Sequence, residues 1–166
     1  MKDFPDLRKP SHLIVTLFGI GKIPFAPGTF ASIIAWIIFV YISHFIDNIF
    51  LLTLFIFIIS IWLCEKASFD LDNRDHKAIV IDELVGMWIA LLPAVYFFTT
   101  QEQRSLYAIF ALIFFRIFDI FKPFPISYFD KKLKNGFGIV FDDVIAACYS
   151  ILATFILLIA LSFFQF

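Results

Sequence analysis

The stretch HKAIVIDELVGMWIALLPAVYFF, residues 76–98, contains two adjacent carboxylates, Asp82 and Glu83, directly before a long run of apolar side chains. The arrangement recurs in GIVFDDVIAACYSILATFILL, residues 138–158, where Asp142 and Asp143 precede another apolar run. Charged side chains at or inside a membrane cost free energy, so acids in this position indicate a functional site. Both pairs are therefore candidates for chemistry at the edge of a membrane.

The composition indicates a membrane protein. Of 166 residues, 61% are hydrophobic and 25 are phenylalanine, and the mean hydropathy is +0.93. Charged residues make up 16%, against about 25% in soluble domains. A chain of this length cannot hide so much apolar surface in one core. We therefore expect an all-α, polytopic membrane helix bundle formed by a single domain, residues 1–166, and we expect no nucleic-acid partner.

About five apolar segments are expected to cross the membrane as helices: 30–46, 49–64, 84–98, 106–118 and 144–164. A hydrocarbon layer of ~30 Å needs about 20 helical residues. Only the last segment reaches that length without flanking residues or local thinning of the bilayer. The earlier stretch LIVTLFGIG, residues 13–21, is too short to cross, and we interpret it as an interfacial or re-entrant segment.

The distribution of basic residues predicts which face is cytoplasmic. With five spans and the N-terminus inside, every one of the 13 Lys and Arg residues except Arg104 lies on the inner side, as the positive-inside rule requires. Both acid pairs share that face. Channels and transporters need polar groups through the midplane, so polar chemistry at one face favours an enzyme acting at the inner leaflet.

The acids are candidates for a metal site. If the helices that follow them pack together, Asp82, Glu83, Asp142 and Asp143 would meet and repel one another. A divalent cation such as Mg²⁺ or Mn²⁺ would remove that repulsion. The alternative is that each pair caps a helix, which contributes ~0.3–1 kcal/mol. Two pairs on one face favour the metal site.

Basic residues at the end of the fourth span could hold a phosphate. Arg116, Asp119 and Lys122 have the spacing i, i+3, i+6, which places them near one face of a helix. A guanidinium binds phosphate as a fork and an ammonium binds it as a point charge. The alternative is that both cations only reach for lipid headgroups.

Two further features have weaker patterns. In GIGKIPFAPGTFAS, residues 19–32, glycines permit close approach of the backbone to an anion, and Thr29 or Ser32 could cap the next helix. A plain capped loop is the alternative. His76 could act as a general acid, although a lone histidine in a loop is more often only solvated.

Four motifs occur in order: PFAPGTFAS, DHKAIVIDELVGM, RIFDIFKPFPI and GFGIVFDDVIAA. Together they resemble the phosphatidylglycerophosphatase A family. The resemblance implies a Mg²⁺-dependent, multi-pass phosphatase of the bacterial inner membrane, with its active site on the cytoplasmic side. Its substrate would be an anionic phospholipid, phosphatidylglycerophosphate, which is converted to phosphatidylglycerol. No obligate protein partner is implied.

The resemblance also implies roles for individual residues. The expected metal ligands are Asp82, Glu83, Asp142 and Asp143. The expected substrate-binding residues are Pro27, Gly28, Thr29, Arg116 and Lys122. The expected catalytic residues, including His76 on its own weaker pattern, are His76, Asp82, Glu83, Asp119 and Asp143.

Other interpretations remain to be tested. DLDNR, residues 70–74, resembles an aspartyl-phosphate motif, but its fifth residue is Arg74 and no βα pattern surrounds it, so we treat it as coincidental. The competing class is a non-enzymatic polytopic membrane protein with a structural cation site. An enzyme should release phosphate in the presence of Mg²⁺, whereas a structural site should only change stability.

Overall fold

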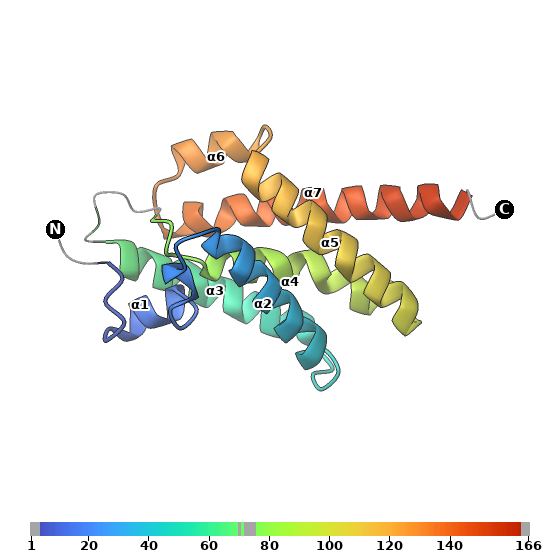
Figure 1. Ribbon diagram of the computed structural model, residues 1–166, viewed down its shortest axis with the longest axis horizontal. Coiled ribbons are helices and arrows are strands. Elements are labelled where there is room, and N and C mark those ends of the chain that lie inside the picture. The colour runs from blue at the N-terminus through green and yellow to red at the C-terminus, as the bar shows by residue number, and fades with distance from the viewer. Residues whose placement is uncertain (1–3, 70, 72–75, 164–166) are drawn as a thin grey trace.

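The computed structural model describes residues 4–69, 71 and 76–163, and these residues form helices and no strand. Figure 1 shows the bundle. The elements are α1 (Pro10–Val15), the 3-10 helix η1 (Ile20–Lys22), α2 (Pro27–Ile42), α3 (Ile49–Ser68), α4 (Ile81–Tyr96), α5 (Gln101–Phe121), α6 (Ile126–Lys132) and α7 (Gly136–Phe163). The all-α prediction is confirmed. Apart from Leu71, the DLDNR stretch lies outside the described residues.

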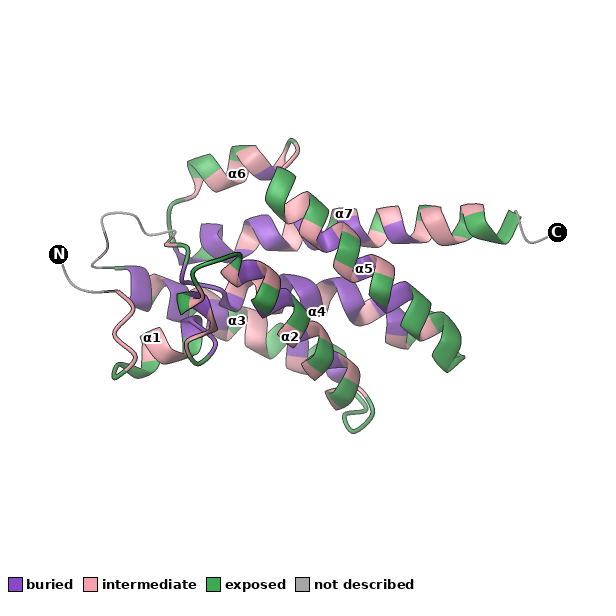
Figure 2. Cartoon of the chain, viewed as in Figure 1, coloured by how far each residue is buried: buried purple, intermediate pink, exposed green. Residues whose placement is uncertain are grey.

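Helix α4 forms the centre of the bundle and contacts α2, α3, α5 and α7. Two aromatic side chains tie its neighbours to it: Trp88 Nε1 donates to the Ala35 carbonyl of α2, and the Tyr107 hydroxyl of α5 donates to the Ala90 carbonyl. Figure 2 shows buried residues along α4 and exposed ones on the outer helices. The stretch that follows Asp82 and Glu83 is therefore the core of the fold.

A glycine sets how closely the helices approach next to the acids. A Cβ added at Gly86 of α4 would lie 2.7 Å from the Phe115 ring of α5 and 3.0 Å from Cβ of Asp143 in α7. Any larger side chain would push these helices apart. Because Gly86 lies one helical turn after Asp82, this contact brings the acids of α4 and α7 together.

Two helices are long and apolar enough to cross a membrane, α3 with 20 residues and α7 with 28, among the residues described. Helix α2 is apolar but has only 16 residues. Helix α4 also has 16 residues, and much of its surface is covered by its neighbours. The five expected spans correspond to α2, α3, α4, α5 and α7, but the number of crossings stays a prediction.

Helix α7 begins at Gly136, well before the expected span at residue 144. A Cβ at Gly136 would lie 2.4 Å from the Ile61 carbonyl oxygen, so the start of α7 packs directly on α3. Asp142 and Asp143 are consequently inside the helix and not in its first turn. Only the first-turn N–H groups lack partners, so the capping alternative is wrong for this pair. Asp82 and Glu83 do lie in the first turn of α4.

The N-terminal segment packs against the residues that lead into α4. Val15 is buried at the end of α1, and its carbonyl accepts a hydrogen bond from the Val80 backbone N–H. The following helix α2 starts at Pro27, with Ala26 as its N-cap and no side-chain cap. The expectation that Thr29 or Ser32 caps this helix is wrong, because both lie inside it.

Candidate active site

The sequence motifs converge on one cavity of about 310 Å³. It lies where α2, α4 and α7 begin and where α5 ends. Ten of its lining residues are expected site residues: Pro27, Gly28, Thr29, Asp82, Glu83, Arg116, Asp119, Lys122, Asp142 and Asp143. Within the described part of the chain, its lining contains more carboxylates than cations.

Three acids form the centre of this cavity. Carboxylate oxygens of Asp82, Glu83 and Asp143 all lie within 4.8 Å of one another. Asp143 is buried, and the two acids of α4 are partly buried. Each acid has one buried oxygen without a hydrogen-bond partner among the described residues: Asp82 Oδ1, Glu83 Oε2 and Asp143 Oδ2. Unpartnered buried oxygens are unfavourable, so the donor set fits a hard divalent cation.

The surroundings of Asp82 and Glu83, which precede the expected span 84–98, disfavour the ionised form of both side chains. Burial raises the pKa of Asp82 well above its usual range, and the adjacent Glu83 carboxylate raises it further. Burial also raises the pKa of Glu83, to about 6, although Arg116 acts in the opposite direction. The protein's own cations therefore leave this cluster short of positive charge.

Asp142 makes a different contact from the other three acids. Its Oδ2 accepts a charge-assisted hydrogen bond from Lys122 Nζ at 2.5 Å, and the same ammonium lies 2.8 Å from Asp130 Oδ1 of α6. Burial lowers the pKa of Lys122, but the two carboxylates outweigh it and raise the pKa above its usual value. Asp142 is not in the close group of three acids, and its expected ligand role stays a prediction.

The backbone at Lys122 explains how this cation reaches α7. Lys122 ends α5 in the left-handed conformation, with φ +42°, and Pro123 follows. Proline cannot continue the helix, so the chain turns back towards α7 and α6 forms. Sequence reasoning did not identify Asp130 as a partner of Lys122. The prolines of KPFP, which reverse the chain and bring α6 back towards Lys122, were the pattern that could have indicated it.

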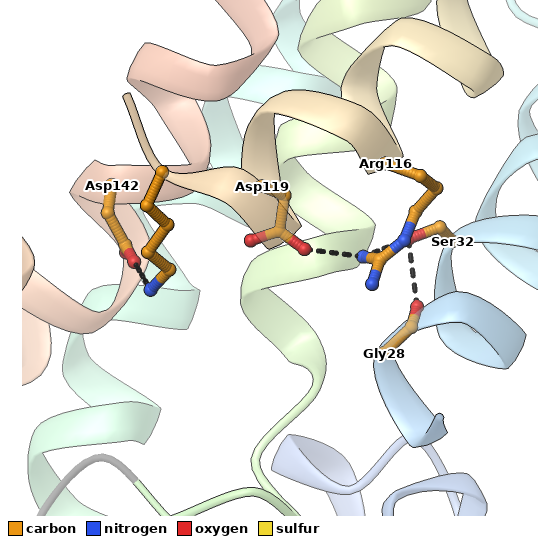
Figure 3. Close-up of polar contacts among 6 residues, drawn as sticks. Gly28, Ser32, Arg116, Asp119 and Asp142 are labelled. Carbon is orange, nitrogen blue, oxygen red and sulfur yellow. Dashed lines mark hydrogen bonds and ion pairs between the residues drawn. The ribbon is translucent and has the colours of Figure 1, made fainter. Parts of the chain in front are cut away.

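Arg116 links the ends of α5 and α2 (Figure 3). Its Nη1 donates to Asp119 Oδ2 at 2.6 Å and to Ser32 Oγ at 3.1 Å. Ser32 Oγ in turn donates to the Gly28 carbonyl at 2.9 Å. The expected placement of Arg116 and Asp119 on one face of a helix agrees with this contact, and Ser32 acts as a bridge instead of a cap.

In the DHKAIVIDE segment the cavity is lined by Lys77 and not by the expected His76. Lys77, which has no assigned role, lines the cavity and is exposed. His76 is not among the residues that line it; its ring lies 4.9 Å from that of Phe4, and its Nδ1 accepts the Ala78 N–H. A loop has no regular period, so the sequence does not show which of its side chains face the cavity. The general-acid role of His76 stays a prediction.

The family model of phosphatidylglycerophosphatase A matches residues 13–158, which include every one of these site residues. The chain belongs to the phosphatidylglycerophosphatase A family. It is similar to phosphatidylglycerophosphatase A of Haemophilus influenzae, with 43% identity over 90% of this chain and 89% of that protein. The corresponding protein of Escherichia coli is 36% identical over 87% of this chain and 81% of its own length.

A further relative, from Bacteroides thetaiotaomicron, is named as a candidate phosphatidylinositol-3-phosphatase and is 35% identical over 87% of this chain and 92% of its own. No solved structure gives a significant match. The resemblance inferred from the four motifs is confirmed, as is the prediction that the chain is an enzyme of a phosphatase family.

Proposed function

We propose that this enzyme hydrolyses the phosphomonoester of phosphatidylglycerophosphate to give phosphatidylglycerol and inorganic phosphate. The observation that carries the proposal is the group of Asp82, Glu83 and Asp143, whose oxygens lie together in the cavity that Arg116 and Lys122 also line. Family membership supports the choice of substrate. In this reaction water attacks phosphorus, the bond from phosphorus to the glycerol oxygen breaks, and that oxygen takes up a proton.

The proposed cofactor is Mg²⁺, held by Asp82, Glu83 and Asp143. The unpartnered oxygens of these three acids support this assignment. When bound there, the ion supplies a Lewis acid that draws negative charge from the phosphate. Asp142 is assigned to position Lys122, with which it forms an ion pair.

The chain's own cations would bind and orient the phosphate. Arg116 has a second terminal nitrogen beyond the one that contacts Asp119 and Ser32, and a guanidinium suits phosphate oxygens. Lys77 and Lys122 also line the cavity, and Lys122 is the one held in place, by Asp130 and Asp142. Because charge spreads over the phosphate oxygens in the transition state, fixed cations lower the barrier. Asp119 holds Arg116 in place, and Pro27, Gly28 and Thr29 form the wall beside it.

We further propose that the enzyme is one domain, residues 1–166, which crosses the bacterial inner membrane about five times with this site on the cytoplasmic side. The apolar helices α3 and α7 support membrane insertion. The location of all basic residues but Arg104 on one side of the expected spans supports the orientation. The segment 13–21 would then lie at the cytoplasmic interface.

The proposal is tested by phosphate release from the purified chain in detergent. Phosphatidylglycerophosphate, phosphatidic acid and phosphatidylinositol 3-phosphate are offered in parallel, with Mg²⁺ or with a chelator. We expect Mg²⁺-dependent release that is fastest with phosphatidylglycerophosphate. Faster release from one of the other lipids would overturn the choice of substrate. Metal-dependent stability without release from any lipid would favour the non-enzymatic alternative.

A further inference from the structure

A second cavity of about 310 Å³ lies at the opposite end of the bundle from the acidic cavity. It is formed by the end of α2, the end of α4 and the beginning of α5, which lie on the same side of the bundle in Figure 1. The acidic cavity is lined by the other ends of these three helices. In the proposed five-span topology the second cavity therefore lies at the periplasmic side.

Much of the lining of this cavity is apolar and fixed. Phe39, Leu91 and Ala94 are buried, and Trp36 is partly buried beside them. Trp36 Nε1 donates to the Ala108 carbonyl of α5 at 2.9 Å, which holds the indole ring in place. A volume of this size, with mainly apolar walls and a few polar groups, falls within the ~300–1,000 Å³ range of small-molecule sites.

One cation stands at the polar side of the cavity. Among the described residues that line it, Arg104 is the only Lys or Arg, and no Asp or Glu is present. Arg104 Nε donates to the Phe98 carbonyl at 2.9 Å, which orients the guanidinium. Its terminal nitrogens have no hydrogen-bond or ion-pair partner among the described residues. Two such nitrogens match two oxygens of a phosphate group, so the cavity has an anion-binding group with no acid to neutralise it.

Further polar side chains surround Arg104 in the lining. His44 Nδ1 lies 2.6 Å from the Val40 carbonyl oxygen. Because a carbonyl only accepts, Nδ1 carries the hydrogen and Nε2 can contact a ligand. Gln101 and Ser105 line the same cavity from the first turns of α5. These groups suit the phosphate and hydroxyl oxygens of a polar headgroup.

The surface beside the cavity has the features of a membrane interface. Tyr41 and Tyr96 are exposed near the ends of α2 and α4, and tyrosines gather at the boundary between lipid and water. Ile37 and Ile109 are also exposed next to the lining. In the proposed topology Arg104 is the only Lys or Arg on this side of the membrane. A ligand with an anionic head and an apolar chain, entering from the surrounding leaflet, fits this combination.

We propose that the second cavity binds an anionic phospholipid of the leaflet opposite the active site, with its phosphate at Arg104 and part of one acyl chain on the apolar lining. A zwitterionic phospholipid also carries a phosphate, but its ammonium would lie near Arg104 with no carboxylate in the lining to pair with it. We therefore expect a preference for headgroups with a net negative charge. The site is separate from the hydrolytic site, so its occupation does not depend on turnover.

The test uses quenching of tryptophan fluorescence in the purified chain in detergent. Trp62→Phe removes the exposed tryptophan and leaves Trp36 in the cavity and Trp88, which is buried outside the lining. A brominated acyl chain quenches an indole only at close range, so quenching reports lipid at Trp36. Brominated phosphatidylglycerol should quench half of the signal at about a tenfold lower concentration than brominated phosphatidylethanolamine, the scale of one charge-assisted hydrogen bond.

Two charge variants, made in the same background, locate this preference. Arg104→Gln should raise the concentration of phosphatidylglycerol needed for half-quenching to that of phosphatidylethanolamine. Lys131→Gln, which removes an exposed cation of α6 outside the lining, should leave the preference unchanged. The proposal is overturned if the preference survives in Arg104→Gln, or if Lys131→Gln removes it equally, because the preference would then reflect overall charge.

A variant that narrows the cavity tests the site with Arg104 in place. Val40→Phe should weaken quenching by both lipids, whereas Ile58→Phe, on an exposed face of α3, should not. Unchanged quenching in Val40→Phe would show that the lipid lies outside the cavity. Glycerol 3-phosphate, which has no acyl chain, should not displace the brominated lipid, and displacement by it would assign the site to a free phosphate. Quenching requires no turnover, so failure of the proposed function would leave this result unaffected.

Discussion

A Cβ added at Gly28 would lie 2.1 Å from Oε1 of Glu83. Gly28 is in the first turn of α2 and Glu83 is in the first turn of α4. The same position is 3.3 Å from Nη2 of Arg116. The first turn of α2 therefore lies directly against Glu83 and the Arg116 guanidinium, and the absence of a side chain at position 28 permits this approach.

Replacing Gly28 with alanine should impair catalysis more than folding. The obstructing atom is at the end of a flexible side chain, so the Glu83 carboxylate can move away, but it then leaves the group of acids. A displacement of about 1 Å in an active site can cost up to ~100-fold in rate. We expect Gly28→Ala to lose roughly tenfold to a hundredfold in kcat with little change in Tm. Phe30→Ala, on an exposed position of the same helix, serves as the control, and normal turnover of Gly28→Ala would contradict the prediction.

Asparagine substitutions distinguish a metal site from other roles of the acids. Asp82→Asn and Asp143→Asn keep the shape of the side chain but remove charge that a hard cation needs. We expect folded proteins whose turnover is lower by roughly a hundredfold, the scale of one lost electrostatic contact to a transition state. Higher Mg²⁺ should restore part of the activity. Asp47→Asn, at an exposed loop position, should behave like the parent.

The same variants can be followed without an activity assay. If Mg²⁺ binds the folded chain only, an ion concentration of 100 times Kd stabilises the protein by ~2.7 kcal/mol. Mg²⁺ should therefore raise the Tm of the parent, and this shift should disappear in Asp143→Asn. An equal Tm shift in both proteins would place the ion elsewhere.

Because Lys122 and Asp142 form an ion pair, removing one partner should destabilise the fold more than removing both. Lys122→Ala leaves the buried Asp142 carboxylate without its cation, which should destabilise the fold by roughly 1–3 kcal/mol and abolish most activity. The double variant Lys122→Ala/Asp142→Asn should recover stability but not turnover. Thermal unfolding and phosphate release measure the two effects, and near-normal turnover of Lys122→Ala would support the headgroup alternative.

Lys77 should contribute to substrate binding and little to the chemical step. It is an exposed cation that lines the cavity, and exposed charge contacts are worth ~0.2–1 kcal/mol. Lys77→Ala should therefore raise KM about twofold to fivefold at an unchanged kcat. Lys66→Ala, whose ammonium lies over Trp62 away from the cavity lining, is the matched control. A fall in kcat at constant KM would assign Lys77 a different role.

The number of membrane crossings can be measured directly. With five spans, a reporter fused after Phe166 and one inserted in the turn before α5 should both report the periplasmic side. A reporter inserted in the chain between α3 and α4 should report the cytoplasm. A cytoplasmic signal at the C-terminal fusion would require an even number of crossings and would remove the five-span topology.

The sequence alone determined the parts of this protein that depend on local pattern. Apolar runs of helical length specify an all-α chain, and the order of four motifs specifies the family. The spacing of Arg116 and Asp119 was enough to place them on one helix face, since one helical turn separates them. The acids were identified as candidates because charge next to hydrocarbon is costly.

Only the tertiary structure decided which of these residues act together. The contact of Asp143 with the acids of α4 depends on the close approach at Gly86, and the pairing of Asp142 with Lys122 depends on the reversal of the chain at Pro123. Neighbours in sequence on α7 point about 100° apart, because a helix has 3.6 residues per turn, so Asp142 and Asp143 meet different partners. The tertiary structure also decided that His76 lies against Phe4, a residue far away in the chain, while Lys77 lines the cavity.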